Sequence, residues 1–155
     1  MEDSIRWIIK DFSTLSVKQL YDVLALRMDV FMLEQKTSLS ECDYKDQKSR
    51  HILGYQNEKL AAYARLLPPD LSYKNPSIGR VVIAKEYRKE GLGTVLMKKA
   101  LSEIQREYPD LSVEISAQAH LKDFYTSLGF HPVDGGKVYL EAGIPHLHMI
   151  CKAVN

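Results

Sequence analysis

The sequence predicts a mixed β-sheet of six to seven strands with helices packed on its faces. Two observations favour this class. Short runs rich in β-branched residues interleave with segments of helical period, and an early strand pair and a late one break strict strand-helix alternation. A hydrophobic share of 45% and a charged share of 26% are ordinary for a globular protein. The length of 155 residues fits one domain, which we place at residues 1–155.

The first third of the chain predicts a strand, a helix and a loop. Residues 5–10 are β-branched and aromatic, and Ser16 with Gln19 has the spacing of a capping box at the start of a helix running to about Glu34. Apolar residues at spacings of three and four predict its buried face: Val17, Leu20, Leu24, Met28 and Phe31. The polar residues 37–50 predict a loop that borders a ligand site.

The middle third predicts a hairpin, a central strand and a second helix. Residues 51–56 and 60–67 are strand-like and joined by Asn57-Glu58. Residues 78–84 form a nearly continuous apolar run, as expected of a strand buried on both faces. The helix that follows ends at Pro109, and its apolar stripe consists of Leu92, Leu96, Ala100, Leu101 and Ile104.

The last third predicts a strand, a short helix and two weaker strands. Apolar and polar residues alternate over residues 112–117, which is typical of a strand. A short helix follows, with Leu121, Phe124, Tyr125 and Leu128 on one face and Gly129 at its end. The weaker strands lie around residues 131–133 and 147–151.

Charge and cysteine content exclude several classes. The formal net charge of +1 and the absence of Lys/Arg runs argue against a nucleic-acid partner. Cys42 and Cys151 lack the spacing of a metal site or a disulfide framework, so we expect no metal. No run of about 20 apolar residues and no secretory signal is present, so we expect no membrane contact and a cytoplasmic location. The sequence leaves open whether the protein forms a homodimer.

The turn before the second long helix predicts a phosphate site. Gly91 and Gly93 let an anion approach the backbone, and the helix start presents unpaired N–H groups with a partial positive charge. Arg88 and Lys89 would add mobile positive charge, and Thr94 a hydroxyl donor. The alternative is that the glycines only turn the chain.

Two other phosphate-binding motifs do not fit this turn. A P-loop needs a lysine after its glycines, whereas Thr94 and Val95 follow Gly93. A dinucleotide-binding turn needs a third glycine where this chain has Leu96.

Two segments resemble the GCN5-related N-acetyltransferases. Val81-Val82-Ile83 followed by Glu86-Tyr87-Arg88-x-x-Gly91-x-Gly93-Thr94 is similar to the acetyl-CoA-binding motif of that family, and Gln118 to Phe130 is similar to its second cofactor motif. Further segments resemble the small bacterial ElaA-type branch: Leu26-Arg27-x-x-Val30-Phe31-x-x-Glu34-Gln35, His51-Ile52-Leu53-Gly54, Ala62-Tyr63-Ala64-Arg65 and Gly143-Ile144-Pro145-His146.

The resemblance implies an acyl-CoA N-acyltransferase fold with acetyl-CoA as cosubstrate. The backbone of residues 81–83 would pair with the pantetheine arm, and that of residues 89–94 would bind the pyrophosphate. The cofactor-binding residues it implies are Val81, Val82, Ile83, Arg88, Lys89, Glu90, Gly91, Leu92, Gly93, Thr94, Gln118, Phe124 and Tyr125. The implied activity is acetyl transfer to a primary amine of an unidentified acceptor, by direct attack in a ternary complex.

Tyr125 is the general acid that the resemblance implies, since a phenol can protonate the departing thiolate yet stays protonated at neutral pH. Its alternative role is that of a core aromatic residue. No base is indicated in the same way, because Val113 stands where many relatives carry a glutamate, and Glu114 faces the opposite way.

The remaining base candidates are histidines and a glutamate. His120 is the candidate that we name as catalytic; the others are His51, His146 and Glu34, or a chain of water molecules. Asp43, Asp46 and Glu34 would attract an ammonium substrate, or would simply be solvated.

Two alternative functions stay open. A non-catalytic domain that binds or senses acyl-CoA would keep the cofactor motifs, and an acyltransferase could use a non-acetyl chain. The second alternative is suggested by residues 26–35, which also resemble a segment of the acyl-homoserine-lactone synthases.

Overall fold

The computed structural model describes residues 4–36, 41–88 and 90–153. Within these, eight strands form one mixed sheet in the order β1-β2-β3-β4-β5-β8-β6, with β7 also paired to β8. The strands are β1 (Arg6–Asp11), β2 (Arg50–Gln56), β3 (Lys59–Leu67), β4 (Ser77–Ile83), β5 (Val113–Gln118), β6 (His131–Pro132), β7 (Val138–Glu141) and β8 (Ile144–Cys151). The mixed sheet predicted from the sequence is confirmed, with one strand more than expected.

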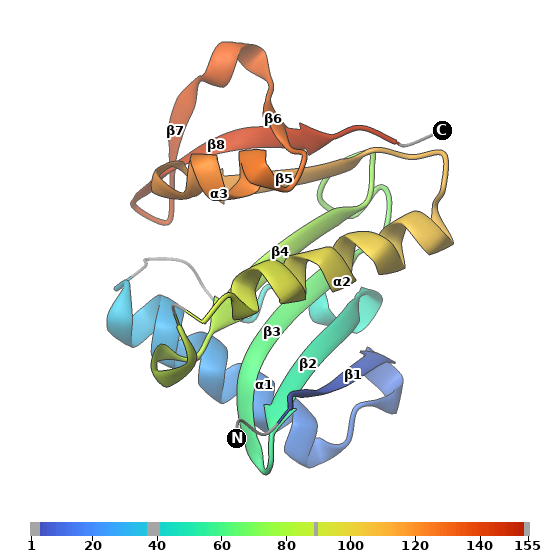
Figure 1. Cartoon of the computed structure of the whole chain (residues 1–155), viewed down its shortest axis with the longest axis vertical. Helices are drawn as coiled ribbons and strands as arrows, with labels where there is room; N and C mark the ends of the chain where they lie inside the picture. The colour runs from blue at the N-terminus through green and yellow to red at the C-terminus, as the bar shows by residue number, and fades with distance from the viewer. Residues whose placement is uncertain (1–3, 37–40, 89, 154–155) are drawn as a thin grey trace.

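Helices cover both faces of this sheet. The helices α2 (Leu92–Glu107) and α3 (Lys122–Ser127) pack on one face, and α1 (Val17–Arg27) packs on the other (Figure 1). The predicted stripe of α2 is largely confirmed, because Leu96, Ala100, Leu101 and Ile104 are buried in its core with Met97. No helix in the described ranges is long and apolar enough to span a membrane.

The predicted buried face of the first helix is wrong at Val17 and Met28, whereas Phe31 packs against the core. Val17 is 88% exposed and Met28 48%, whereas Val23, Leu26, Arg27 and Val30 are the buried residues. The buried stripe contains an arginine, which forms ion pairs at the sheet, so hydrophobicity alone selects the wrong face. The capping box at Ser16 is confirmed.

The same helix changes its winding before it ends. The segment η2 (Met28–Glu34) is a π-helix, in which Gln35 N–H donates to the Val30 carbonyl. Such segments are rare and often lie at functional sites, because one extra residue per turn shifts the following side chains. Here the shift brings Phe31 and Gln35 to a cleft in the sheet.

That cleft exists because β4 and β5 diverge. The two strands are parallel neighbours, but their register contains the single pair Ser77–Glu114. Beyond it the edge of β4 has no strand partner toward β5 among the described residues, and Val81 and Ile83 are only half-buried. The prediction that residues 78–84 are buried on both faces is therefore wrong at this end.

A bulge further reshapes β4. Tyr63 of β3 pairs with Val82 and Arg65 with Gly79, so Arg80 and Val81 face one residue of β3. Arg80 has a φ of 50°, which is unusual for a residue with a side chain. The bulge reverses which side chains of β4 face each side of the sheet.

Candidate functional site

A cleft of about 420 Å³ lies between the diverging ends of β4 and β5. Ile115 and Ala117 of β5 share the core of α2 with Leu147 and Met149 of β8, so the alternate residues of both strands face the α1 side. The cleft therefore has two walls. The apolar wall is formed by Met97, Leu121, Phe124 and Tyr125; the polar wall is formed by Ser116, Gln118, Glu141 and His146.

The glycine turn lies at the mouth of the cleft. Gly91 has a φ of 77°, which favours glycine, and it begins α2 with no side-chain cap from the part of the chain that the structure describes. The first helical bond runs from Val95 N–H to the Gly91 carbonyl, at 3.3 Å. The N–H groups of residues 92–94 precede it and point out of the helix start. This arrangement suits an anion.

Gly93 keeps the approach to these groups clear. A Cβ atom built there would lie 3.6 Å from the Phe124 ring and 4.0 Å from Ile83, at the lining of the cleft. The fold would tolerate that contact, but the added atom would occupy space beside the exposed backbone.

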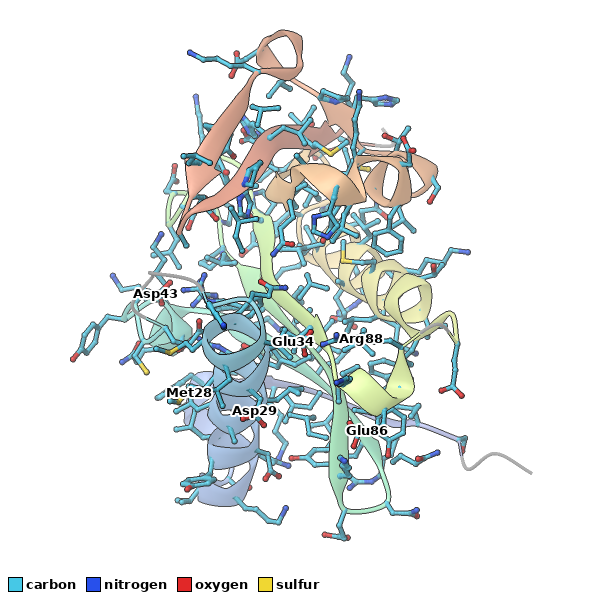
Figure 2. All side chains as sticks on the ribbon, turned by 90° about the vertical axis from the view of Figure 1, so that its left-hand side faces the viewer. Met28, Asp29, Glu34, Asp43, Glu86 and Arg88 are labelled. Carbon is cyan, nitrogen blue, oxygen red and sulfur yellow. The ribbon has the colours of Figure 1, made fainter. Side chains whose placement is uncertain are left out.

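The prediction that Arg88 is mobile is wrong. Its Nε donates to the Ile83 carbonyl at 2.9 Å, and its two terminal nitrogens both bind Glu34, whose carboxylate points at Arg88 in Figure 2. The hydrogen bond and charge of Arg88 lower the pKa of Glu34. The pair ties the π-helix to the turn. Lys89, the other predicted cation, lies outside the described residues.

Tyr125 lies on the apolar wall and is 8% exposed. Its ring packs edge-on against Phe124 and Phe130, with centroids 5.1 and 6.0 Å away. Burial raises the pKa of Tyr125 to about 12, so its hydroxyl keeps its proton at neutral pH. The residue is thus a core aromatic that lines the cleft with a protonated hydroxyl.

A closed group of charges lies beside the cleft on the α1 side. We call it the ion-pair cluster; it consists of Arg27, Glu41, Asp43, Asp46, Arg65 and Arg80. Asp46 accepts from both Arg27 and Arg65, at 2.8 and 2.9 Å. Burial would raise the pKa of Asp46, but these two arginines lower it.

The prediction that Asp46 attracts a substrate is therefore wrong, and so is the view that it is solvated. Asp43 is bound by Arg65 through both carboxylate oxygens, each at 2.9 Å. Burial opposes the effect of Arg65, but the pKa of Asp43 is still lowered to about 2. These carboxylates are occupied within the protein.

The model of the acetyltransferase (GNAT) domain matches residues 16–153. The chain belongs to the GNAT acetyltransferase family. It is 44% identical to protein ElaA of Escherichia coli (strain K12), over 97% of this chain and 99% of that protein.

Solved structures of this acetyltransferase family agree with the fold. The crystal structure of Escherichia coli ElaA has a TM-score of 0.89 at 43% identity, and covers 96% of this chain and 99% of its own. An acyl-CoA N-acyltransferase from Pseudomonas aeruginosa has the same TM-score at 40% identity, covering 95% and 99%. A GNAT family acetyltransferase from Elizabethkingia anophelis with acetyl-CoA bound has a TM-score of 0.63 at 18% identity, covering 96% of each chain.

In this acetyltransferase-family chain, the base candidates fall in different places. His120 lies in a short 3₁₀ turn and lines the cleft, but it is exposed, and no hydrogen bond in the described part of the chain fixes its ring. His51 is buried between Tyr63 and the Asp46 carbonyl, away from the cleft lining. His146 lies on the polar wall.

Glu141, the last residue of β7, was not predicted from the sequence. That strand is four residues long, follows Gly135-Gly136, and exposes Val138 by 55% and Leu140 by 73%. An apolar outer face at a sheet edge does not produce the usual strand signal. Gln118, which the resemblance implies as a cofactor-binding residue, lies on the polar wall, and its amide donates to Gln35 at the end of the π-helix at 3.1 Å.

Proposed function

We propose that this protein is an acetyl-CoA-dependent N-acetyltransferase that transfers the acetyl group to a primary amine by direct attack in a ternary complex. The observation that supports it most is the cleft itself, which joins an uncapped helix start, an unpaired strand edge and a buried phenol. Acetyl-CoA supplies an activated thioester.

The residues of the cleft fit the parts of acetyl-CoA. The edge of β4 offers the backbone groups of Val81 and the N–H of Ile83 to the amides of the pantetheine arm, while the Ile83 carbonyl already accepts from Arg88. The N–H groups at the start of α2, Gly93 among them, match a pyrophosphate. Acetyl-CoA bound to the related Elizabethkingia anophelis acetyltransferase supports the same occupant here.

Tyr125 is then the general acid. It would donate its proton to the thiolate that leaves when the amine attacks the thioester carbon, and a strand N–H near Ile83 would stabilise the oxyanion. The reaction is expected in the cytoplasm, where acetyl-CoA is made available to such enzymes.

The test follows thiol release from acetyl-CoA over a panel of primary amines, with Tyr125→Phe in parallel. We expect saturable release in the wild type and a loss of roughly 10²- to 10⁴-fold in the variant. Stability should not fall, because the Tyr125 hydroxyl makes no hydrogen bond with the described residues that the variant would remove.

A thermal-shift titration separates the alternatives. Acetyl-CoA at about 100 times its Kd should stabilise the fold by about 2.7 kcal/mol. Stabilisation without turnover on any amine would support an acyl-CoA-binding or sensing domain, and turnover with longer acyl chains alone would support a different acyl donor. Absence of stabilisation would contradict all three functions.

A further inference from the structure

His146 is held in one tautomer on the polar wall. Its Nδ1 lies 2.7 Å from the Ile144 carbonyl, which can only accept, so Nδ1 carries a proton. In the neutral ring, Nε2 then bears the lone pair. This nitrogen faces Oε2 of Glu141 at 3.6 Å, beyond hydrogen-bond length. The residue is 7% exposed and lines the cleft.

A relay of hydroxyl groups fixes the carboxylate of Glu141. Ser116 Oγ donates to Glu141 Oε1 at 2.9 Å, so the Tyr139 hydroxyl, 2.6 Å from Ser116 Oγ, must be a donor to it. The Tyr139 ring also stacks on the His146 ring, with centroids 6.4 Å apart and planes at 23°. Glu141 and His146 are both oriented, and Oε2 is left without a donor from this relay.

Two hydrogen-bond acceptors, His146 Nε2 and Glu141 Oε2, thus lie side by side at the cleft, 3.6 Å apart. An ammonium group can donate to both at once, since it has three N–H bonds and no lone pair. These two groups also lie on the opposite side of β5 from Tyr125, so an amine substrate bound to them would not occupy the apolar wall.

Resting on the proposed function, we propose that His146 Nε2 is the general base for the acceptor amine and that Glu141 is its positioning residue. Nε2 takes a proton from the ammonium nitrogen: one N–H bond breaks on the acceptor and one forms on the imidazole. The freed electron pair attacks the thioester carbon, the carbon–sulfur bond breaks, and the thiolate takes the proton of Tyr125. The amide nitrogen then loses its second proton to solvent, the Tyr125 phenolate regains a proton from solvent, and the imidazolium releases its proton to solvent. Glu141 stabilises the imidazolium.

His148 provides a matched control on the same strand and the same face. Its Nε2 lies 2.7 Å from Glu114 Oε1, so that nitrogen is already engaged as a donor, and its ring stacks on Tyr73 away from the cleft lining. Nε2 is therefore a hydrogen-bond donor in His148, whereas in neutral His146 it carries the lone pair. The other titratable or charged groups near the polar wall are Tyr73, Glu41, Arg80 and His120.

The experiment compares His146→Asn with His148→Asn. Asparagine can keep a donor toward the Ile144 carbonyl but has no basic nitrogen. With the best amine of the panel, we expect kcat to fall about 10²- to 10⁴-fold in His146→Asn and to stay within about threefold in His148→Asn. Thermal stabilisation by acetyl-CoA should be equal in all three proteins.

The pH dependence identifies a base. Without a general base, only amine substrate that is already neutral in solution reacts. The neutral fraction of the amine rises about tenfold per pH unit below the pKa of the amine, near 10. The ratio of wild-type to His146→Asn rates should therefore fall as pH rises. Glu141→Gln should raise KM for the amine and show a weaker form of the same trend.

NMR tests the protonation of the two histidines without any amine substrate. The ¹⁵N chemical shifts should show a bare Nε2 on His146 and a protonated Nε2 on His148. A pH-independent rate ratio, equal losses in both variants, or a protonated Nε2 on neutral His146 would overturn the assignment while leaving the acetyltransferase function intact. If no amine releases thiol, the proposed function fails and the assignment fails with it.

Discussion

The ion-pair cluster and the polar wall lie on the same side of the sheet but differ in how their polar groups are bonded. In the cluster, each carboxylate is met by a guanidinium, and the Nε of Arg65 is the one buried side-chain polar atom of the described residues without a hydrogen bond. On the polar wall, His146 and Glu141 present acceptors to each other across 3.6 Å. The paired carboxylates of the cluster contribute to folding, whereas the two unpaired acceptors of the polar wall leave a place for a ligand.

The largest effect on folding should come from breaking the cluster at Arg27. This side chain is fully buried and binds Glu41 and Asp46, so Arg27→Met would leave two buried carboxylates with less compensation. We expect a loss of about 3–5 kcal/mol in the free energy of unfolding, measured in urea. The folded fraction should still bind acetyl-CoA.

Arg106→Met is the control, since that side chain is 68% exposed and its pair with Glu103 is a surface one. Its cost should be about 0–1 kcal/mol. If both arginine variants unfold alike, the cluster does not stabilise the fold in the way its burial indicates.

A smaller effect should appear as pH falls, and in two phases. His51 is buried neutral: its Nε2–H donates to the Asp46 carbonyl and its Nδ1 accepts from Tyr63. Burial lowers the pKa of His51, so below its unfolded value near 6.5 the unfolded chain binds more protons and stability decreases. The slope can approach about 1.4 kcal/mol per pH unit.

The second phase belongs to the cluster carboxylates. The pKa values of Asp43 and Asp46 are lowered in the folded state, to about 2 for Asp43, whereas the unfolded value is near 3.9. Their contribution is therefore present above about pH 4 and is lost as pH falls toward 2. In His51→Gln the upper phase should disappear and the lower one stay; an unchanged upper phase would contradict the assignment to His51.

The sequence predicted the parts of the site that come from neighbouring residues. The glycine turn, the amphipathic helix after it and the helix carrying Tyr125 were each found from local spacing. It did not predict pairings between distant residues. Asp46 binds Arg27 and Arg65, each 19 residues away in the sequence, and Arg88 binds Glu34, which is 54 residues away. Such contacts exist only once the sheet has formed.

The same limit explains the missed half of the polar wall. Glu141 reaches Ser116 over 25 positions, through a strand whose apolar side chains face outward. Charge and period along the chain carry no sign of this contact. The π-helix was missed for a different reason: its residues have ordinary helical period, and only packing decides the winding.

The helix N-termini show the same contrast between paired and unpaired groups, and here we expect the smallest effect on stability. Ser16 Oγ accepts from Gln19 N–H at 3.0 Å and Gln19 Oε1 accepts from Ser16 N–H at 2.9 Å, whereas α2 begins at Gly91 with no such cap. Ser16→Ala should cost about 1 kcal/mol of unfolding free energy and leave the stabilisation by acetyl-CoA unchanged. Urea unfolding with and without acetyl-CoA measures both. If acetyl-CoA stabilised this variant less than the wild type, the two helix N-termini would be coupled, and the capped N-terminus of α1 would also contribute to ligand binding.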